Sequence, residues 1–284
     1  MPEAIQSVDF KGLSLAAARR AIVPVLRERG LEEPEREARL LIELATRMTA
    51  ERVLLEEGRP LTADEATELS GFLKRRLGRV FEVTRAVLDP RPETETLIDA
   101  VLEHVDATGG RGRALRLLDV GTGSGAIMVT LLKELPNATG LGTDVSPAAL
   151  EVAKANARRH GVEGRVTFEV RRSLDGIAGP FDVLVSNPPY IARGDLAGLA
   201  PEVRNFDPPE ALDGGADGLD IYRQIARRAG EVVPHGLLAL EVGAGQANDV
   251  GRIFTEALAG ACKGPILRAD LGGHARCVAV LTHS

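Results

Sequence analysis

The sequence predicts an α/β protein in which a mostly parallel, doubly wound sheet follows a small N-terminal helical bundle. From Arg85 onward, short apolar runs alternate with helical segments, as they do where parallel strands are joined by helices. One of these runs leads directly into a glycine-rich loop. Residues 13–78 show helical periodicity instead. We therefore expect two domains, a helical leader over residues 1–79 and an α/β domain over residues 80–284.

The leader is rich in Leu, Ala, Glu and Arg, and its helical pattern breaks near Gly30, Thr49 and the segment Gly58–Leu61. These breaks divide it into about four short helices. Its acidic and basic side chains are equal in number, so it is not a basic nucleic-acid arm. Its one cationic cluster, Lys74-Arg75-Arg76 with Arg79, is typical of a helix C-terminus. The alternative is contact with an acidic protein surface or with RNA.

The first strand of the α/β domain is predicted at Leu115–Val120 and the next helix at Ala126–Leu135. Between them, glycines let the backbone turn tightly and approach a ligand, and the helix start offers free N–H groups. The spacing G-x-G-x-G differs from the dinucleotide motif G-x-G-x-x-G, and no G-K-[ST] follows, so a P-loop is excluded. The candidate binding residues are Asp119, Gly121, Thr122, Gly123, Ser124 and Gly125. The alternative is a plain tight turn.

The second strand is predicted at Thr139–Thr143 and ends at Asp144. A carboxylate at this place usually hydrogen-bonds ribose hydroxyls, which makes Asp144 a candidate nucleoside-binding residue. The alternative is a cap or turn residue. Ser146 is a suitable N-cap and Pro147 a suitable first residue for the helix Ala148–His160. The remaining elements are predicted as strands at 166–170, 182–186 and 236–242 and as a helix around 220–233.

The segment Asn187-Pro188-Pro189-Tyr190 follows Phe181–Ser186, an apolar run predicted to be a buried strand. The two prolines stiffen the loop and remove two N–H donors, so the local polar groups that are left are mainly acceptors. The Asn187 side-chain oxygen and the Pro188 carbonyl can each accept one hydrogen of a planar NH2 group, while Tyr190 covers its flat face. The loop therefore predicts an amino or amide nitrogen as nucleophile. The alternative is an ordinary strand-to-loop turn.

Together, these motifs resemble a class I S-adenosylmethionine-dependent methyltransferase of the amino-methylating kind. More closely, the chain resembles the PrmC/HemK family, whose members methylate the glutamine side-chain amide in the Gly-Gly-Gln motif of class 1 peptide chain release factors. The resemblance covers essentially residues 85–284, preceded by a helical leader of the expected kind. Besides the motifs above, it includes Val87–Glu95, Phe206–Gly215, Asp217–Asp220 and Asp270–Arg276.

The resemblance implies a Rossmann-like methyltransferase fold, S-adenosyl-L-methionine as methyl donor without a metal, a release factor as protein partner, and substrate recognition by the leader. It places Asp119 near the methionine amino group and the segment with Glu93 beside the donor pocket. Either residue serves loop structure alone in the alternative interpretation. The residues implied in substrate binding are Asn187, Pro188, Pro189 and Tyr190, of which Asn187 also borders the donor.

The catalytic residues of this hypothesis are Asn187, Pro188 and Tyr190. An amide nitrogen is a poor nucleophile because its lone pair is delocalised, so the loop has to hold it in line with the methyl group. Acceptors aimed at both amide hydrogens stabilise the positive charge that develops on nitrogen in the transition state. No strong base is needed, because the protonated amide is acidic enough for water to take its proton.

Two segments depart from the family pattern. Around Leu77–Val83, family members carry a longer stretch, so the shortening either affects domain orientation and substrate docking or is a harmless change of linker length. At Arg171–Asp175, the family has an acidic or small polar residue beside an aromatic that borders adenine. This chain has no aromatic there, which leaves Ser173 and Asp175 as candidates for the adenine contact.

Composition agrees with a soluble cytoplasmic enzyme, because 284 residues with 44% hydrophobic and 27% charged content allow one full domain and a smaller one. No apolar run approaches the roughly 18 residues of a membrane span, and the N-terminus lacks the features of a secretory signal. Cys262 and Cys277 have no paired spacing, so we expect buried thiols in a reducing compartment. The histidines are scattered and form no metal-ligand set. We expect a monomer.

Three alternative functions stay open. A DNA adenine or rRNA guanine N-methyltransferase can use the same loop, but flipped bases need aromatic stacking and a cationic phosphate track. This chain has a net charge of −6 and 3% aromatic residues, so we do not expect direct nucleic-acid binding. A ribosomal-protein glutamine is the second alternative substrate. An inactive donor-binding scaffold is the third, and retention of the whole loop 187–190 counts against it.

Overall fold

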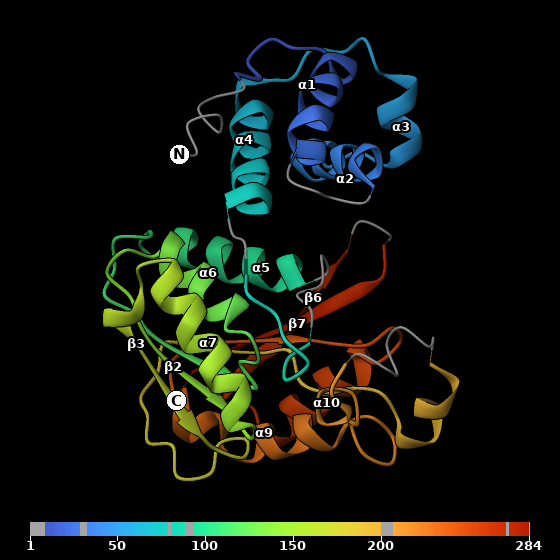
Figure 1. Cartoon of the computed structure of the whole chain (residues 1–284). Coiled ribbons are helices and arrows are strands. Elements are labelled where there is room, and N and C mark those ends of the chain that lie inside the picture. Colours follow the sequence, from blue (N-terminus) through green and yellow to red (C-terminus); the bar gives the residue numbers. More distant parts are fainter. Residues whose placement is uncertain are drawn as a thin grey trace. The chain divides into compact units, whose positions relative to one another are not determined.

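The computed structural model describes residues 9–28, 33–78, 81–88, 94–199, 207–270 and 273–283, with the side chains of all of these except 74–78. The chain divides into two compact units, Met1–Val80 and Phe81–Ser284 (Figure 1). Several features of the sequence lie wholly or partly outside this description. They are Gly30, the side chains of the cationic cluster at 74–76 with Arg79, the centre of the join at Arg79 and Val80, residues 89–93 with Glu93, Phe206, and residues 271–272.

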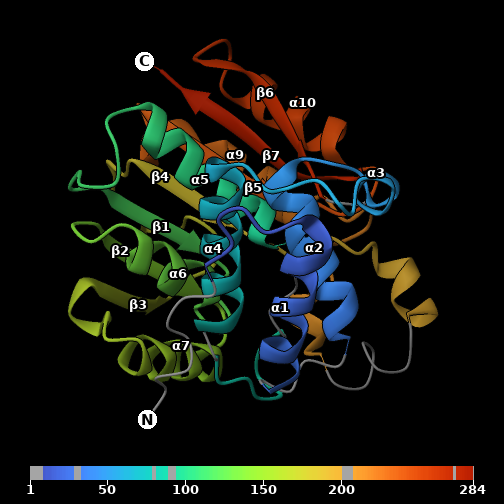
Figure 2. The same cartoon turned by 90° about the horizontal axis from the view of Figure 1, so that it is seen from above.

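The first unit is helical in its described part (Figure 2). Its helices are α1 (Leu15–Glu28), α2 (Pro34–Thr46), α3 (Ala50–Leu55) and α4 (Ala63–Gly78). Thr49 caps α3, because its hydroxyl accepts a hydrogen bond from the Arg52 N–H. Thr62 and Glu65 form a reciprocal capping box at the start of α4, with bonds of 2.8 and 3.2 Å. The core side chains include Phe10, Leu15, Ile22, Leu26, Ile42 and Leu69. The predicted helical leader is confirmed.

The second unit is built on one seven-stranded sheet in the order β3-β2-β1-β4-β5-β7-β6. The strands are β1 (Arg116–Val120), β2 (Thr139–Asp144), β3 (Val166–Val170), β4 (Val183–Ser186), β5 (Gly236–Glu241), β6 (Cys262–Ala269) and β7 (Ala275–Thr282). All pairs from β3 to β5 are parallel, whereas β7 runs antiparallel to both β5 and β6. The mostly parallel sheet predicted from the sequence is confirmed.

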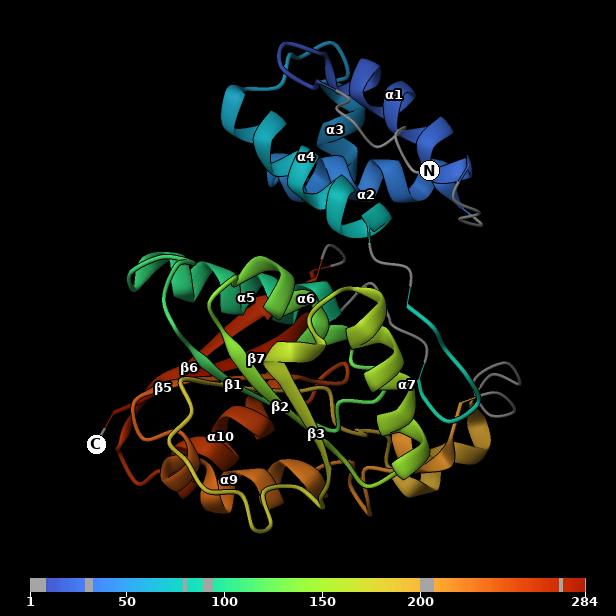
Figure 3. The ribbon, with the colours of Figure 1, turned by 60° about the vertical axis from the view of Figure 1, so that its left-hand side comes forward.

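Helices cover both faces of this sheet (Figure 3). One face carries α5 (Thr94–Ala107), α6 (Ala126–Glu134) and α7 (Pro147–Arg159), and the other carries α9 (Asp220–Val232) and α10 (Ala247–Ala257). Successive side chains of a strand point to opposite faces, so Leu117 packs in the first helical layer and Leu118 in the second. Both faces are buried, which explains why the central strands read as continuous apolar runs.

The site is positioned by the strand order. β1 lies between β2 and β4, so the direction of winding reverses there, and open α/β sheets bind their ligands at the carboxyl ends of the strands at such a reversal. The glycine loop follows β1, and Asp144 ends β2. Asn187 follows β4, and Glu241 ends β5. Because these strands are parallel, all four features meet at one edge of the sheet.

Some elements were not predicted from the sequence, namely α5, α10 and the β6–β7 hairpin. β6 is largely exposed and contains Gly264 and Pro265, so it lacks the alternation that identifies a half-buried strand. The prediction that both thiols are buried is partly wrong. Cys277 in β7 is buried, but Cys262 at the end of the exposed edge strand is only half-buried, and both are free thiols.

Candidate active site

The loop after β1 needs glycine for its conformation. Gly121, Gly123 and Gly125 have φ values of 73°, 52° and 78°, all in the left-handed region. A Cβ at Gly121 or Gly123 would meet no atom within 4 Å, whereas a Cβ at Gly125 would lie 3.2 Å from the Cβ of Ala153 in α7. Gly121 and Gly123 therefore border open space that a ligand can enter. Gly125 allows α6 to begin close against α7.

The polar side chains of this loop point into the protein. Thr122 and Ser124 are buried, and the Thr122 hydroxyl donates to Asp119 Oδ2 at 2.6 Å. Asp119 is itself fully buried, and its Oδ1 has no hydrogen-bond partner of normal geometry among the described residues. Burial raises the pKa of Asp119 to about 7, and the Asp144 charge adds to this rise, while the Thr122 hydroxyl and the Met128 N–H oppose it. Asp119 thus stabilises the glycine loop from the buried side, through its hydrogen bond with Thr122.

Asp144 ties the end of β2 to the glycine loop. One carboxylate oxygen accepts from the Gly123 N–H at 3.0 Å, and the other accepts from the Ser146 N–H at 2.9 Å. The cap of α7 is supplied by Ser146, whose hydroxyl accepts from the Ala149 N–H at 3.2 Å. Asp144 is half-buried, and each carboxylate oxygen retains a second acceptor site for a ligand hydroxyl.

Two exposed apolar side chains lie beside Asp144. Val145 follows Asp144 in the chain and is 46% exposed. Val170 on β3 is the register partner of Asp144 and is 54% exposed. The chain after β3 begins with a bond from the Arg171 N–H to the Asp144 carbonyl at 2.9 Å. It then turns at Ser173, whose φ is 51° and whose Oγ is buried without a partner in the described structure. The exposed side chains of Val145 and Val170 offer an apolar surface that suits a planar heterocycle.

The loop after β4 places Asn187 in a short chain of hydrogen bonds. Its Nδ2 donates to the hydroxyl oxygen of Thr94 at 3.4 Å, and Thr94 is the first residue of α5. The Thr94 hydroxyl donates to Glu241 Oε2, at the end of β5, at 2.7 Å. Pro188 is buried, whereas Asn187 is half-exposed. The structure therefore fixes this side-chain amide from one side and leaves its other side accessible.

Tyr190 is held by its backbone and by two glycines. Its carbonyl accepts from Gln246 Nε2 at 2.9 Å, and Gln246 Oε1 in turn accepts from the Gly243 N–H at 3.1 Å. A Cβ at Gly218 would lie 2.3 Å from the Tyr190 carbonyl oxygen, and one at Gly243 would lie 2.9 Å from the Tyr190 ring. Both positions must be glycine if Tyr190 is to keep this place.

The sequence predicted the loop residues but missed part of what holds them. Thr94 was noted only within the segment beside the donor pocket, and Glu241 and Gln246 were not identified. Glu241 carries one recognisable signal, because it is a carboxylate at the carboxyl end of an otherwise apolar parallel strand. Glu93 stays a prediction, because it lies outside the described residues.

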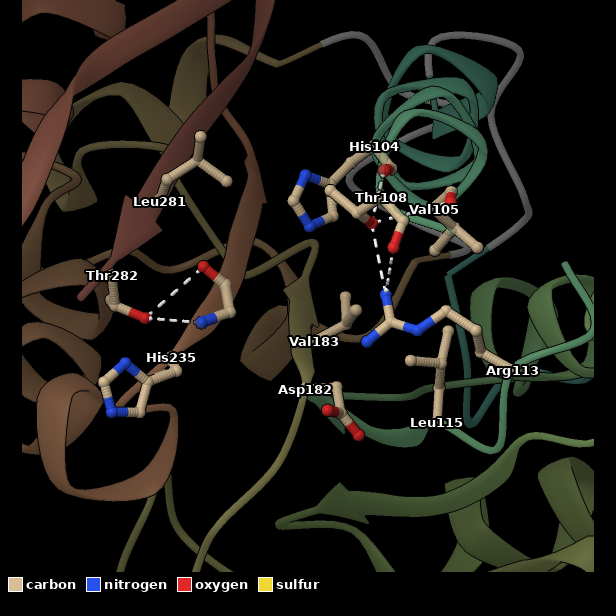
Figure 4. Close-up of a pocket in the computed structure, with 11 residues that line it drawn as sticks. His104, Val105, Thr108, Arg113, Leu115, Asp182, Val183, His235, Leu281 and Thr282 are labelled. Carbon is tan, nitrogen blue, oxygen red and sulfur yellow. Dashed lines mark hydrogen bonds between the residues drawn. The ribbon is translucent and has the colours of Figure 1, made fainter. Parts of the chain in front are cut away.

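A separate cavity of about 260 Å³ lies at the opposite edge of the sheet (Figure 4). Val183 and Gly236, the first residues of β4 and β5, line it, so it opens at the amino ends of the strands. Arg113 enters it and donates to the Thr108 carbonyl and hydroxyl at 3.1 and 3.2 Å. Burial, with a smaller contribution from the charge of Arg113, lowers the pKa of His104. None of the candidate site residues lines this cavity, so it is distinct from the candidate site at the carboxyl ends of the strands.

Two further findings concern the described residues alone. No group of three or more His, Cys, Asp and Glu side chains among them is arranged to hold a metal ion. No helix in the same part of the chain is long and apolar enough to cross a membrane.

The reversal of winding at β1, the G-x-G-x-G loop and the acid that ends β2 define a class I S-adenosylmethionine-dependent methyltransferase. In agreement, the model of the Methyltransferase domain family matches residues 112–228. The catalytic domain of hMettl16 in complex with MAT2A 3'UTR hairpin 6 has the same fold, with a TM-score of 0.58 at 16% identity over 77% of this chain and 81% of that one. At this identity the likeness shows the fold alone.

The family follows from closer relatives. The model of the PrmC N-terminal domain matches residues 17–80. The chain is 43% identical to the release factor glutamine methyltransferase of Rhodospirillum rubrum, over 89% of this chain and 80% of that protein. It is 38% identical to the enzyme of the same name from Bradyrhizobium diazoefficiens, over 96% of both. The chain belongs to the PrmC/HemK family of release factor glutamine methyltransferases, which confirms the resemblance found in its motifs.

Proposed function

We propose that this protein transfers the methyl group of S-adenosyl-L-methionine to the side-chain amide nitrogen, N5, of the glutamine in the Gly-Gly-Gln motif of class 1 peptide chain release factors. The observation that carries this proposal is the loop 187–190 at the carboxyl end of β4, where Asn187 is held from behind by Thr94. The names and coverage of the relatives support the substrate.

The residues at the edge of the sheet fit the methyl donor. The donor supplies an electrophilic methyl group on a sulfonium. Gly121 and Gly123 leave open space in which the donor can approach the loop backbone closely, and Asp144 has acceptor sites for ribose hydroxyls. Val145 and Val170 offer apolar surface to the adenine. Asp119 acts through the loop, because its carboxyl is buried against Thr122.

Catalysis in this proposal rests on orientation and charge. The Asn187 Oδ1 and the Pro188 carbonyl accept the two amide hydrogens of the substrate glutamine, and Tyr190 packs against the amide plane and excludes water. These contacts are strongest when positive charge develops on the nitrogen, so they lower the barrier rather than only binding the substrate. Water takes the proton after methyl transfer.

The helical leader serves protein-substrate recognition in this proposal. Its match to the PrmC N-terminal domain supports this role, and its balanced charge favours a protein over a nucleic-acid partner. We place the enzyme in the cytoplasm, where release factors terminate translation, and we propose that it acts as a monomer. Size-exclusion chromatography with light scattering tests the oligomeric state.

The decisive experiment is transfer of labelled methyl to a purified class 1 release factor. It runs beside a substrate whose Gly-Gly-Gln is changed to Gly-Gly-Ala and beside an Asn187→Ala enzyme. Label that requires both the glutamine and Asn187 supports the proposal. Label found instead on a ribosomal protein, DNA or rRNA would show that this molecule, and not the release factor, is the substrate. Donor binding without any turnover would identify an inactive scaffold.

A further inference from the structure

Three elements converge behind Asn187. Glu241 ends β5 and is 3% exposed, and Thr94 begins α5 and is 7% exposed. β4 and β5 are parallel with Ser186 opposite Leu240, so Asn187 and Glu241 take the next places on neighbouring strands. The Thr94 hydroxyl lies between their side chains, at 3.4 Å from Asn187 Nδ2 and 2.7 Å from Glu241 Oε2.

The direction of these hydrogen bonds follows from the chemistry of the groups. A glutamate carboxylate only accepts, and a threonine hydroxyl has one hydrogen to donate. The Thr94 hydroxyl donates to Glu241 Oε2 at 2.7 Å, so the Thr94 hydrogen points to Glu241. Thr94 can then only accept from Asn187, which must turn its NH2 group toward Thr94. Its Oδ1 is thereby directed to the opposite side.

This direction matters because an asparagine amide can turn over without changing its shape. In the reversed orientation, Asn187 would present an NH2 group to the NH2 group of a substrate amide. Two donors would then face each other, and the substrate nitrogen would lose one of its two acceptors.

We propose that Glu241 and Thr94 are positioning residues that select the orientation of the Asn187 side-chain amide in which Oδ1 faces the substrate. This inference rests on the proposed role of Asn187 in amide methylation. The Glu241 backbone is also anchored, since its carbonyl accepts from the buried Tyr222 hydroxyl at 2.7 Å. The hydrogen bonds from Asn187 to Thr94 and from Thr94 to Glu241, here called the relay, therefore connect the anchored end of β5 to the Asn187 side chain. The orientation of that side chain decides whether the substrate nitrogen is bound.

The test compares Thr94→Val, which keeps the shape and removes the hydroxyl, with Thr94→Ser, which keeps the hydroxyl. We expect Thr94→Val to lower kcat about tenfold to a hundredfold, with donor affinity within about twofold of wild type. Thr94→Ser should restore most of the rate. Glu241→Gln should also lower kcat. A glutamine NH2 group can donate to the Thr94 oxygen, and the Thr94 hydroxyl is then able to turn its own hydrogen toward Asn187. The matched control is Thr130→Val, which removes the hydroxyl of a buried threonine on α6.

A double-substitution cycle separates positioning from a structural role. In an Asn187→Ala background, Thr94→Val should cause no further loss of kcat, because its effect passes through Asn187. Additive losses would overturn the inference. So would an unchanged kcat in Thr94→Val, or a rate loss in Thr94→Ser equal to that in Thr94→Val.

A readout without turnover keeps this test independent of the substrate. With selective ¹⁵N labelling of asparagine, the Asn187 side-chain NH2 signals are the pair that disappears in Asn187→Ala. They should shift in Thr94→Val and Glu241→Gln and stay unchanged in Thr94→Ser and Thr130→Val. Unchanged signals in all variants would refute the relay even if methylation proceeds. Absence of release-factor labelling by wild type, with these shifts present, would instead reject the proposed function alone.

Discussion

Replacement of Gly218 by alanine is expected to displace Tyr190 and slow catalysis. The new Cβ would lie 2.3 Å from the Tyr190 carbonyl oxygen and 2.7 Å from Gln246 Nε2, whereas ordinary van der Waals contacts begin at 3.4 Å. Relief of this overlap requires a shift of about 1 Å in the segment that carries Tyr190, since the conflict with the carbonyl is with backbone. A misplacement of about 1 Å in a catalytic group can cost about 10²-fold in rate.

The matched control is Gly161→Ala. Gly161 has a φ of 65°, close to the 77° of Gly218, but a Cβ there would meet no atom within 4 Å. Both substitutions force alanine into the left-handed region, at a cost of about 1–2 kcal/mol, so the difference between them isolates the overlap with Tyr190. Urea unfolding measures the cost of the left-handed conformation. Steady-state methyl transfer measures the effect of the overlap with Tyr190 on kcat. Equal kcat values for the two variants would refute the assigned role of Gly218.

Other predictions concern the donor site and the core. The pKa of Asp119 is raised from 3.8 to about 7, so the stability it contributes is present below pH 3.8 and is lost as pH rises through 7. Relative to Asp119→Asn, wild type should therefore lose up to about 4 kcal/mol in the free energy of unfolding between pH 4 and 8, and parallel pH profiles would contradict this. Asp144→Ala should weaken donor binding by about tenfold or more in calorimetry, through loss of acceptors for ribose and of the bond to Gly123. Val170→Asp should weaken it similarly while the melting temperature stays near wild type, because Val170 is 54% exposed. Leu118→Ala should lower the free energy of unfolding by about 2–5 kcal/mol, because its side chain is fully buried.

Local chemistry explains what could be predicted from sequence. The glycine loop follows from residues that adopt positive φ at little cost, and α7 begins where Ser146 and Pro147 predict it. The central strands are buried on both faces and therefore appear as uninterrupted apolar runs. The loop 187–190 is recognisable because two prolines and an asparagine leave a set of acceptors in a fixed place. Each of these signals lies within a few residues of the feature it predicts.

The partners of these residues are a tertiary matter. Thr94 and Glu241 are separated by 147 positions, and only the crossing of α5 over the end of β5 brings them to 2.7 Å. Gln246 reaches Tyr190 across 56 positions in the same way. No periodicity or turn preference encodes such a meeting, because it depends on strand order and on how the helices pack on the sheet. The sequence by itself determined the fold class, the family and the loops that carry the chemistry. The tertiary structure decided which side chains hold Asn187 and Tyr190 in place, since hydrogen bonds depend on proximity in space and not on distance along the chain.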